Sequence, residues 1–270
     1  MNTRILFTDL DGTLLDDNKN ITSGNQQAID EALSQGHKIV LSTGRPLASA
    51  RIQAERLGLT REGCYAITYN GGLIYDLYRQ ETLFGKTIPK NIVLELFYAA
   101  SERCLHIHTY TDTHILSCYD TAELHEYSSS TLLPYCIADR SLHELTSEPY
   151  KVLAIDYKNM DPLLSYQHDI LGKYSDLLDS FFSSDCFLEI VPKNINKGAS
   201  VKWLCEYLGI PLENSVAAGD AQNDISMLEA AQIGAVMCNA FPGIAEHGNY
   251  ITSADNNHDG VAEIIRKFIL

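Results

Sequence analysis

The sequence alternates short apolar runs with longer stretches in which apolar residues recur at helical spacing. Residues 4–8, 38–42 and 65–69 are short, mostly apolar runs, which are typical of strands buried on both faces of a sheet. Between these runs, the pattern predicts one helix that ends near Gly36 and another over about 47–57. Strand, helix, strand, helix and strand with short links indicate a parallel sheet with right-handed crossovers.

A different pattern begins near Phe84 and occupies the middle of the chain. It predicts helices over about 91–101, 122–130 and 162–171, and strand-like runs at 106–110, 114–117, 150–156 and 181–190. After residue 190 the first pattern returns, with strands at 216–219 and 233–237 and helices near 198–208, 225–231 and 261–269. We therefore predict an α/β fold, in which residues 1–83 and 191–270 form a Rossmann-like parallel-sheet core and residues 84–190 form an inserted α+β domain.

Composition narrows the class of protein. A chain of 270 residues that is 45% hydrophobic can bury a proper core. Its net charge of −15 argues against nucleic acid or an anionic membrane as the main partner. There is no signal-peptide pattern and no apolar run of the roughly 18 residues that a membrane span needs. The seven scattered cysteines never form a Cys-x-x-Cys pair, so we expect reduced thiols and a cytoplasmic protein.

The first candidate for chemistry is the segment Asp9-Leu10-Asp11-Gly12-Thr13, which directly follows the first predicted strand. Two carboxylates two residues apart leave a strand on the same side, and Gly12 allows the chain to turn sharply. In such a pair, one carboxylate can attack an electrophile while the other moves a proton.

Three further loops are predicted to leave the same carboxyl edge of the sheet, at 43–45, 196–198 and 219–224. Thr43 and the Gly44 amide could donate to a phosphate, Lys197 could bind it as a cation, and Asp220 adds a carboxylate. Each feature also has an ordinary explanation, since Thr43 could cap a helix, Lys197 could be a solvated surface residue, and Asp220 and Asp224 could favour a helix N-terminus. The ordered set, with each member at a strand or helix edge, favours a single site.

Several carboxylates in one cleft need a cation. A pair of carboxylates about 4 Å apart repels by roughly 4 kcal/mol at an effective dielectric near 20. An oxygen-rich site that also accepts a phosphate therefore predicts Mg²⁺ as the cofactor.

The motifs strongly resemble those of the haloacid dehalogenase superfamily. The residues that carry the resemblance are Asp9-Leu10-Asp11-Gly12-Thr13, Ser42-Thr43-Gly44-Arg45, Asn196-Lys197-Gly198 and the segment from Gly219 to Asp224. With Tyr69-Asn70-Gly71-Gly72 and the large insertion, the sequence is most similar to the Cof-type, YidA-like branch of phosphatases.

This resemblance implies a Mg²⁺-dependent hydrolase of phosphomonoesters of small metabolites, with sugar phosphates as the first candidates. It implies that Asp9 attacks phosphorus to form an aspartyl-phosphate, while Asp11 protonates the leaving group and then deprotonates water. The implied metal ligands are Asp9, the Asp11 main-chain carbonyl and Asp220, with Asp224 beside them. The implied phosphate-binding residues are Leu10 through its amide, Thr43, Gly44, Lys197 and Asn223, and Arg45 and Asn70 are candidates for substrate contacts.

Other functions stay open at this level. A phosphomutase would pass the phosphoryl group to a second hydroxyl of a sugar, and a phosphatase could instead act on a phosphorylated cofactor such as pyridoxal phosphate or flavin mononucleotide. A non-catalytic sensor is disfavoured because both Asp9 and Asp11 are present. We expect the insertion to act as a cap that contacts the substrate, and no obligate protein partner is evident. Its histidines, His106, His108 and His114, fit a half-exposed strand better than a metal site.

Overall fold

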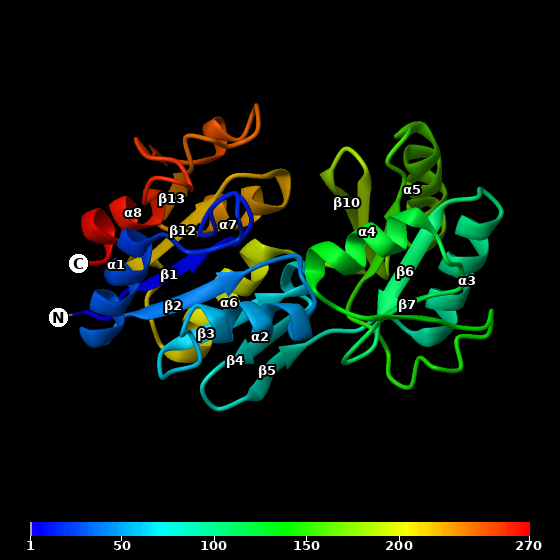
Figure 1. Ribbon diagram of the computed structural model, residues 1–270, viewed down its shortest axis with the longest axis horizontal. Coiled ribbons are helices and arrows are strands. Elements are labelled where there is room, and N and C mark those ends of the chain that lie inside the picture. Colours follow the sequence, from blue (N-terminus) through cyan, green and yellow to red (C-terminus); the bar gives the residue numbers. More distant parts are fainter. Residues whose placement is uncertain (1) are drawn as a thin grey trace. The chain divides into compact units, whose positions relative to one another are not determined.

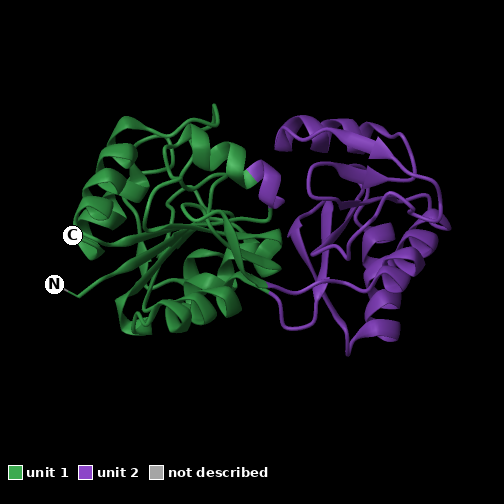
Figure 2. Cartoon of the chain, turned by 90° about the horizontal axis from the view of Figure 1, so that it is seen from below, with its two compact units in different colours: residues 1–44, 50–84, 196–270 green, residues 45–49, 85–195 purple. Residues whose placement is uncertain are grey.

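The computed structural model describes residues 2–270, which form two compact units (Figure 2). The first unit contains the residues up to Gly44, residues 50–84 and residues 196–270. The second unit contains residues 45–49 and 85–195. The boundaries of the inserted segment therefore follow Phe84 and Ile195, whereas the sequence pattern places them after 83 and 190. The assignment of residues 45–49 to the second unit has no counterpart in the sequence pattern.

The first unit is built on a sheet with the strand order β14-β13-β12-β1-β2-β3-β4-β5 (Figure 1). These strands are β1 (Ile5–Thr8), β2 (Lys38–Ser42), β3 (Cys64–Thr68), β4 (Leu73–Asp76), β5 (Glu81–Gly85), β12 (Ser215–Gly219), β13 (Ile233–Val236) and β14 (Tyr250–Ile251). From β14 to β3 the neighbours run parallel, which confirms the predicted parallel core. In contrast, β4 runs antiparallel to β3, because the few residues between them are too short for the crossover that a parallel pair requires.

Helices pack against this sheet. They are α1 (Ser23–Ser34), α2 (Leu47–Arg56), α6 (Lys197–Leu208), α7 (Ile225–Ala230) and α8 (Gly260–Phe268), with short 3₁₀ helices at Tyr69–Gly71, Leu212–Asn214, Gln222–Asp224 and Ala245–His247. Phe7 of β1 belongs to the same apolar cluster as Val201 and Leu204 of α6 and Met227 of α7. The helices α1 and α8 pack together and lie side by side in Figure 1. Every residue of β1 is buried, as its apolar run predicts.

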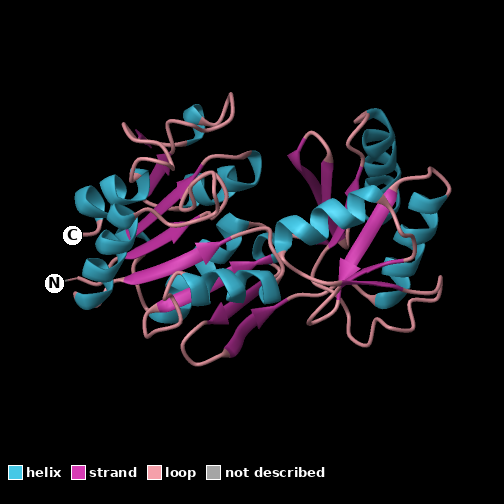
Figure 3. Cartoon of the chain, viewed as in Figure 1, coloured by secondary structure: helices cyan, strands magenta, loops and turns pink. Residues whose placement is uncertain are grey.

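The second unit contains a sheet with the strand order β10-β11-β9-β6-β7-β8. Its elements are α3 (Lys90–Ser101), β6 (His106–Tyr110), β7 (Ile115–Ser117), α4 (Ala122–Thr131), β8 (Tyr135–Ile137), β9 (Val152–Ile155), α5 (Asp161–Tyr174), β10 (Leu178–Ser184) and β11 (Phe187–Pro192) (Figure 3). One face of the sheet, which carries Ile107, packs with α3 and α5 into an apolar core. Successive strand residues face opposite sides, so His108 lies on the other face, where its ring is 4.5 Å from that of Tyr127 on α4.

One strand prediction in this unit is wrong, and one strand was missed. The run 181–190 is not one strand, because β10 and β11 form an antiparallel hairpin across residues 185 and 186. The polar residues Ser183, Ser184 and Asp185 interrupt the apolar run and favour a turn there. Strand β8 was not predicted, since three residues are too few to show an alternating pattern.

The prediction of a half-exposed histidine strand is also wrong for His106 and His108, because every residue of β6 is buried, whereas His114 is half-buried and lies just before β7. His106 Nε2 lies 2.9 Å from His108 Nδ1, and His108 Nε2 lies 3.1 Å from the Tyr110 hydroxyl. Burial lowers the pKa of His106 to about 4 and the pKa of His108 well below its ordinary value. The rings are therefore neutral groups that satisfy one another. Within residues 2–270, no cluster able to hold a metal ion includes them.

Within residues 2–270, none of the helices combines the length and the hydropathy that a membrane-spanning segment needs. The cysteines of these residues are free thiols, as their scattered positions predict.

Candidate active site

Three carboxylates meet at the carboxyl edge of the first unit's sheet. Asp9, Asp220 and Asp224 each offer an oxygen within 4.8 Å of the others, and all three are buried. Asp9 follows β1 and Asp220 follows β12, and these strands are parallel neighbours whose ends are in register. The Asp9 amide continues the ladder by donating to Ala218 O at 3.0 Å. Parallel pairing thus joins loops that are far apart in the sequence.

Lys197 lies inside this group of carboxylates. It is fully buried, and its Nζ is 2.6 Å from Asp9 Oδ1 and 2.6 Å from Asp224 Oδ1. Burial alone would lower the pKa of Lys197, but Asp224 and Asp9 outweigh that effect and raise the pKa above its ordinary value. Lys197 therefore remains an ammonium ion that two carboxylates share.

The start of α6 fixes the position of Lys197. Asn196 caps this helix, and its Oδ1 accepts a hydrogen bond from Ala199 N at 2.8 Å. The next residue, Gly198, permits close packing, because a Cβ there would lie 2.1 Å from Ser226 O of α7. The sequence Asn-Lys-Gly therefore supplies a cap, a cation and a small residue at a point where α6 and α7 approach closely.

The Asp220 loop is held by hydrogen bonds within the first unit. Thr13 Oγ1 donates to Asp220 Oδ1 at 2.6 Å, and Asp224 Oδ2 accepts from the amides of Asp220 and Ala221, both at 3.0 Å. Burial, and after it the charge of Asp224, raise the pKa of Asp220 to about 7. Burial also raises the pKa of Asp9 well above its ordinary value, although Lys197 opposes this.

These raised pKa values indicate that one ammonium ion does not balance three buried carboxylates. A divalent cation with a preference for oxygen ligands would supply the missing charge. Asp9 and Asp220 are the better placed ligands, because both oxygens of Asp224 already accept hydrogen bonds from Lys197 and the loop amides.

Asp11 and Gly12 complete the first loop. The Asp11 carboxylate pairs with Lys19 Nζ at 2.8 Å and is 37% exposed, and it is not one of the three grouped carboxylates. Gly12 has φ +81°, and a Cβ there would lie 2.5 Å from Asp220 Oδ2, so only glycine fits. Sequence reasoning missed Lys19, since a lysine in a polar loop carries no distinguishing signal.

The predicted neutral phosphate-binding residues lie beside one another. The Thr43 amide donates to Ile67 O at 2.8 Å, and Thr43 O accepts from Asn70 N at 3.1 Å. Asn223 Nδ2 donates to Asn70 Oδ1 at 3.1 Å, and a Cβ on Gly44 would lie 3.0 Å from that same oxygen. Leu10, between the two catalytic candidates, is fully buried. The structure thus brings Thr43, Gly44, Asn70 and Asn223 together.

Arg45 is placed differently. Its guanidinium donates to Ser130 O at 3.1 Å and to Ser49 Oγ at 3.2 Å, and Ser49 Oγ donates to Thr131 O at 2.6 Å. Both carbonyls end α4, where cations are favoured by the helix dipole. Arg45 therefore caps a helix within the second unit, and its role as a substrate contact stays a prediction.

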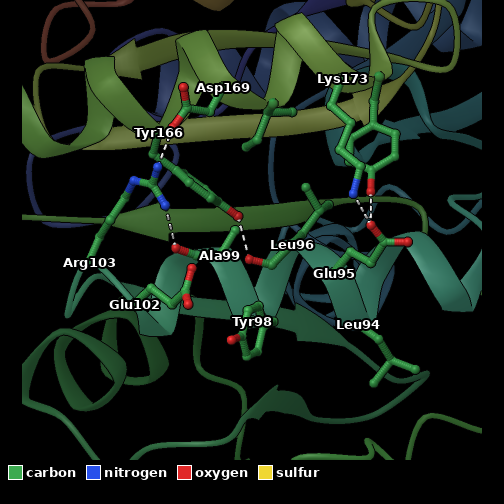
Figure 4. Close-up of a pocket in the computed structure, with 12 residues that line it drawn as sticks. Leu94, Glu95, Leu96, Tyr98, Ala99, Glu102, Arg103, Tyr166, Asp169 and Lys173 are labelled. Atoms are coloured by element: carbon green, nitrogen blue, oxygen red, sulfur yellow. Dashed lines mark hydrogen bonds and ion pairs between the residues drawn. The ribbon is translucent and has the colours of Figure 1, made fainter.

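A separate cavity of about 430 Å³ lies between α3 and α5 of the second unit (Figure 4). The Tyr166 hydroxyl donates to Leu96 O at 2.7 Å, and two ion pairs line the cavity, Arg103 with Asp169 and Lys173 with Glu95. None of the predicted site residues lines it. The carboxylate group in the first unit is therefore the better candidate for catalysis.

Comparisons with known proteins show what the whole chain is similar to. Residues 6–265 match the haloacid dehalogenase-like hydrolase family. A Streptococcus pyogenes serotype M6 protein, provisionally named a phosphatase, is 34% identical over 271 residues, which cover 100% of both chains. A Bacillus subtilis protein named 5-amino-6-(5-phospho-D-ribitylamino)uracil phosphatase is 31% identical, with 99% of this chain and 96% of the relative covered. A haloacid dehalogenase-like hydrolase from Bacteroides thetaiotaomicron has a TM-score of 0.90 at 28% identity, with 98% of this chain and 99% of that chain covered.

Proposed function

Because this chain belongs to the haloacid dehalogenase-like hydrolases and is a phosphatase of that family, we propose that it hydrolyses phosphomonoesters of small metabolites with Mg²⁺ at the Asp9 site. One observation carries this proposal. The buried Asp9 carboxylate lies 2.6 Å from Lys197 Nζ and groups with two further carboxylates, Asp220 and Asp224. This is the arrangement that a nucleophile, a charge-neutralising lysine and a cation site require.

Asp9 is the nucleophile in this mechanism. Lys197 holds Asp9 Oδ1, so Oδ2 is the oxygen that attacks phosphorus. The P–O bond to the alcohol breaks as the bond to Oδ2 forms, which leaves an aspartyl-phosphate and an alkoxide. A water molecule then attacks the same phosphorus, which releases inorganic phosphate and regenerates the Asp9 carboxylate.

Asp11 moves the proton. Its carboxyl group gives a proton to the departing alkoxide and then takes one from the attacking water. The pair that it forms with Lys19 is exposed, and exposed ion pairs contribute only about 0–1 kcal/mol, so Asp11 can exchange partners readily. Asp11 is thus the half-exposed member of the loop, as a residue that exchanges protons with incoming water should be.

The remaining residues of the site position the carboxylates and balance the charge of the site and of the phosphoryl group. Lys197 and Asp224 hold Asp9 and the Asp220 loop in place, and Thr13 orients the Asp220 carboxylate. Mg²⁺ held by Asp9, Asp220 and the Asp11 carbonyl would neutralise the excess carboxylate charge and stabilise negative charge on the phosphoryl oxygens. Thr43, Gly44, Asn223 and the Leu10 amide supply neutral donors to the same oxygens.

We assign substrate selection to the second unit. Its sequence forms an insertion in the core, and insertions of this kind can exclude water and contact the part of the substrate beyond the phosphate. The B. subtilis relative is named for a phosphorylated ribitylamino-uracil, which supports a small phosphorylated metabolite as the substrate and adds compounds of that kind to the candidates beside sugar phosphates.

The test is phosphate release from p-nitrophenyl phosphate with Mg²⁺, followed by a panel of phosphorylated sugars and cofactors. Asp9→Asn should abolish turnover because the amide cannot form the aspartyl-phosphate. Asp30→Asn is the matched control, since Asp30 is a surface carboxylate on α1 that pairs with Arg61, and it should retain activity. Normal turnover by Asp9→Asn would exclude Asp9 as the nucleophile. Phosphate transfer to a second hydroxyl, without phosphate release, would indicate a mutase instead.

A further inference from the structure

One buried amide beside the catalytic loops has a donor with no partner. Asn70 is only 1% exposed, and its Nδ2 makes no hydrogen bond with any group of residues 2–270. Buried polar atoms are nearly always paired, and an exception in a site needs an explanation such as a missing ligand. We propose that Asn70 is a further phosphoryl-binding residue, whose Nδ2 donates to a non-bridging oxygen of the transferring phosphoryl group. This inference rests on the phosphatase function proposed above.

Asn70 lies in a left-handed backbone segment that is unfavourable for its neighbour Tyr69. Tyr69, Asn70 and Gly71 have φ values of +53°, +56° and +109°. The left-handed region suits glycine and is tolerated by asparagine, but it is disfavoured for a tyrosine. Such conformations persist where the surrounding structure enforces them, and they cluster at binding sites. The strain here therefore needs a reason, and the placement of the Asn70 side chain provides one.

The neighbours that enforce this conformation are themselves parts of the site. The Asn70 amide N donates to Thr43 O at 3.1 Å, and a Cβ on Gly71 would lie 2.5 Å from Asn196 O, the residue before Lys197. The left-handed segment is thus clamped between the Thr43 loop and the start of α6. Both of these segments carry proposed phosphate-binding groups.

The side-chain amide has a defined orientation. Asn223 Nδ2 donates to Asn70 Oδ1 at 3.1 Å, which uses the oxygen and leaves Nδ2 as the unpaired end. A Cβ on Gly44 would lie 3.0 Å from Asn70 Oδ1 and 3.1 Å from Nδ2, so the absence of a side chain at Gly44 makes room for this amide. Asn70 Nδ2 therefore lies beside Gly44 and Asn223, two residues proposed to bind the phosphate.

The chemistry of the site calls for a neutral donor at this position. The buried cation of this site, Lys197, is already shared by Asp9 and Asp224. An amide N–H stabilises negative charge on a phosphoryl oxygen without adding a charge that the free site would have to balance. Because every phosphomonoester presents the same phosphoryl oxygens, the contribution of Asn70 should not depend on the rest of the substrate.

The experiment compares Asn70→Gly and Asn70→Asp with the wild-type chain. Glycine keeps the left-handed backbone and removes the amide, whereas aspartate keeps the size and the acceptor for Asn223 but replaces the donor by an oxygen. Asn194→Gly is the matched control, since Asn194 also has a positive φ, +64°, but is exposed and belongs to the second unit. The measurements are the inhibition constant of orthovanadate, kcat/KM for three chemically different esters, Mg²⁺ affinity and circular dichroism.

We expect Asn70→Gly to weaken orthovanadate binding about ten- to hundredfold, the range for losing a hydrogen bond to a charged partner. The value of kcat/KM should fall by a similar factor for all three esters, and Asn70→Asp should lose more because its oxygen repels the anion. In Asn70→Gly, Mg²⁺ affinity and the circular dichroism spectrum should be unchanged, and the control should match the wild-type chain. A merely structural role would instead alter Mg²⁺ affinity or the spectrum.

Unchanged orthovanadate affinity in Asn70→Gly would overturn the inference. A loss of kcat/KM that differs strongly among the esters, with orthovanadate affinity unchanged, would also overturn it, because it would place Asn70 on the variable part of the substrate. If the wild-type chain releases phosphate from no ester, the phosphatase proposal fails by itself. In that case calorimetry compares orthovanadate binding by the wild-type chain and by Asn70→Gly. Equal affinities of the two chains, or no binding by the wild-type chain, would overturn the inference about Asn70.

Discussion

Replacing Lys197 by methionine should destabilise the first unit when no metal is present, and Mg²⁺ should offset much of the loss. Lys197 is fully buried, and its Nζ lies 2.6 Å from both Asp9 Oδ1 and Asp224 Oδ1. Methionine keeps the length and apolar character of the side chain but removes the charge. Both carboxylates then lose their buried cation.

The expected magnitude follows from these contacts. One ammonium–carboxylate pair contributes about 4 kcal/mol when the charges are about 4 Å apart at an effective dielectric near 20. Two pairs give a gross attraction of about 8 kcal/mol, but removing Lys197 also removes the several kcal/mol needed to desolvate its ammonium. The free energy of unfolding should therefore fall by about 3–5 kcal/mol, which is the range for removing one partner of a buried ion pair.

Urea unfolding at pH 7, with EDTA or with Mg²⁺, measures this loss. Trp203 is the chain's one tryptophan and lies on α6, so its fluorescence reports on the first unit. Lys151→Met is the matched control, because Lys151 is only 1% exposed and pairs with Glu189 at 2.9 Å in the second unit. Its loss of stability, followed by circular dichroism, should not depend on Mg²⁺.

Two results would refute this reasoning. A loss below about 1 kcal/mol for Lys197→Met in EDTA would mean that Asp9 and Asp224 do not depend on Lys197 for their charge balance. An equal loss with and without Mg²⁺ would mean that the cation does not compensate these carboxylates.

Three further predictions concern the two units. Thr13→Val removes the donor 2.6 Å from Asp220 Oδ1 and should raise the pKa of Asp220 beyond its value of about 7. Calorimetry should then show at least about tenfold weaker Mg²⁺ binding at pH 7 and a smaller effect at pH 9, where protons no longer compete. Gly198→Ala should lower Tm by overpacking α6 against α7, since its Cβ would lie 2.1 Å from a carbonyl oxygen of α7, and an unchanged Tm would contradict that packing. The pKa of His106 is lowered to about 4, so between pH 6.5 and pH 4 the unfolded chain binds a proton that the folded chain does not. Stability of the second unit should therefore be complete above pH 6.5 and fall by up to about 3 kcal/mol as the pH drops to 4, and urea titrations of wild type and His106→Gln should differ in that window.

Some features were predictable because they depend on local pattern and on general rules of sheet topology. The apolar runs at β1 and β2 specify strands buried on both faces, and the polar residues that follow must then lie at the carboxyl edge. This is why Asp9 and Lys197, 188 residues apart, could be assigned to one site before any coordinates were considered.

Other features depend on partners that no local pattern reveals. Arg45 has the same charge whether it contacts substrate or caps α4, and its actual contacts come from residues 130 and 49. The left-handed conformation of Tyr69 and Asn70 is imposed by the Thr43 loop and α6, not by the residues themselves.

The sequence by itself determined the parallel core and the loops that carry the carboxylates, because hydrophobic periodicity reports which segments must be buried. Only the tertiary structure decided how buried polar groups are paired. In the structure, Lys197 is shared by Asp9 and Asp224, and His106 and His108 are buried and contact each other through their ring nitrogens. Asn70 Nδ2 has no hydrogen-bond partner among residues 2–270. The physical reason is that burying a polar group is tolerated only when a partner satisfies it, and such partners come from segments that are distant in the sequence.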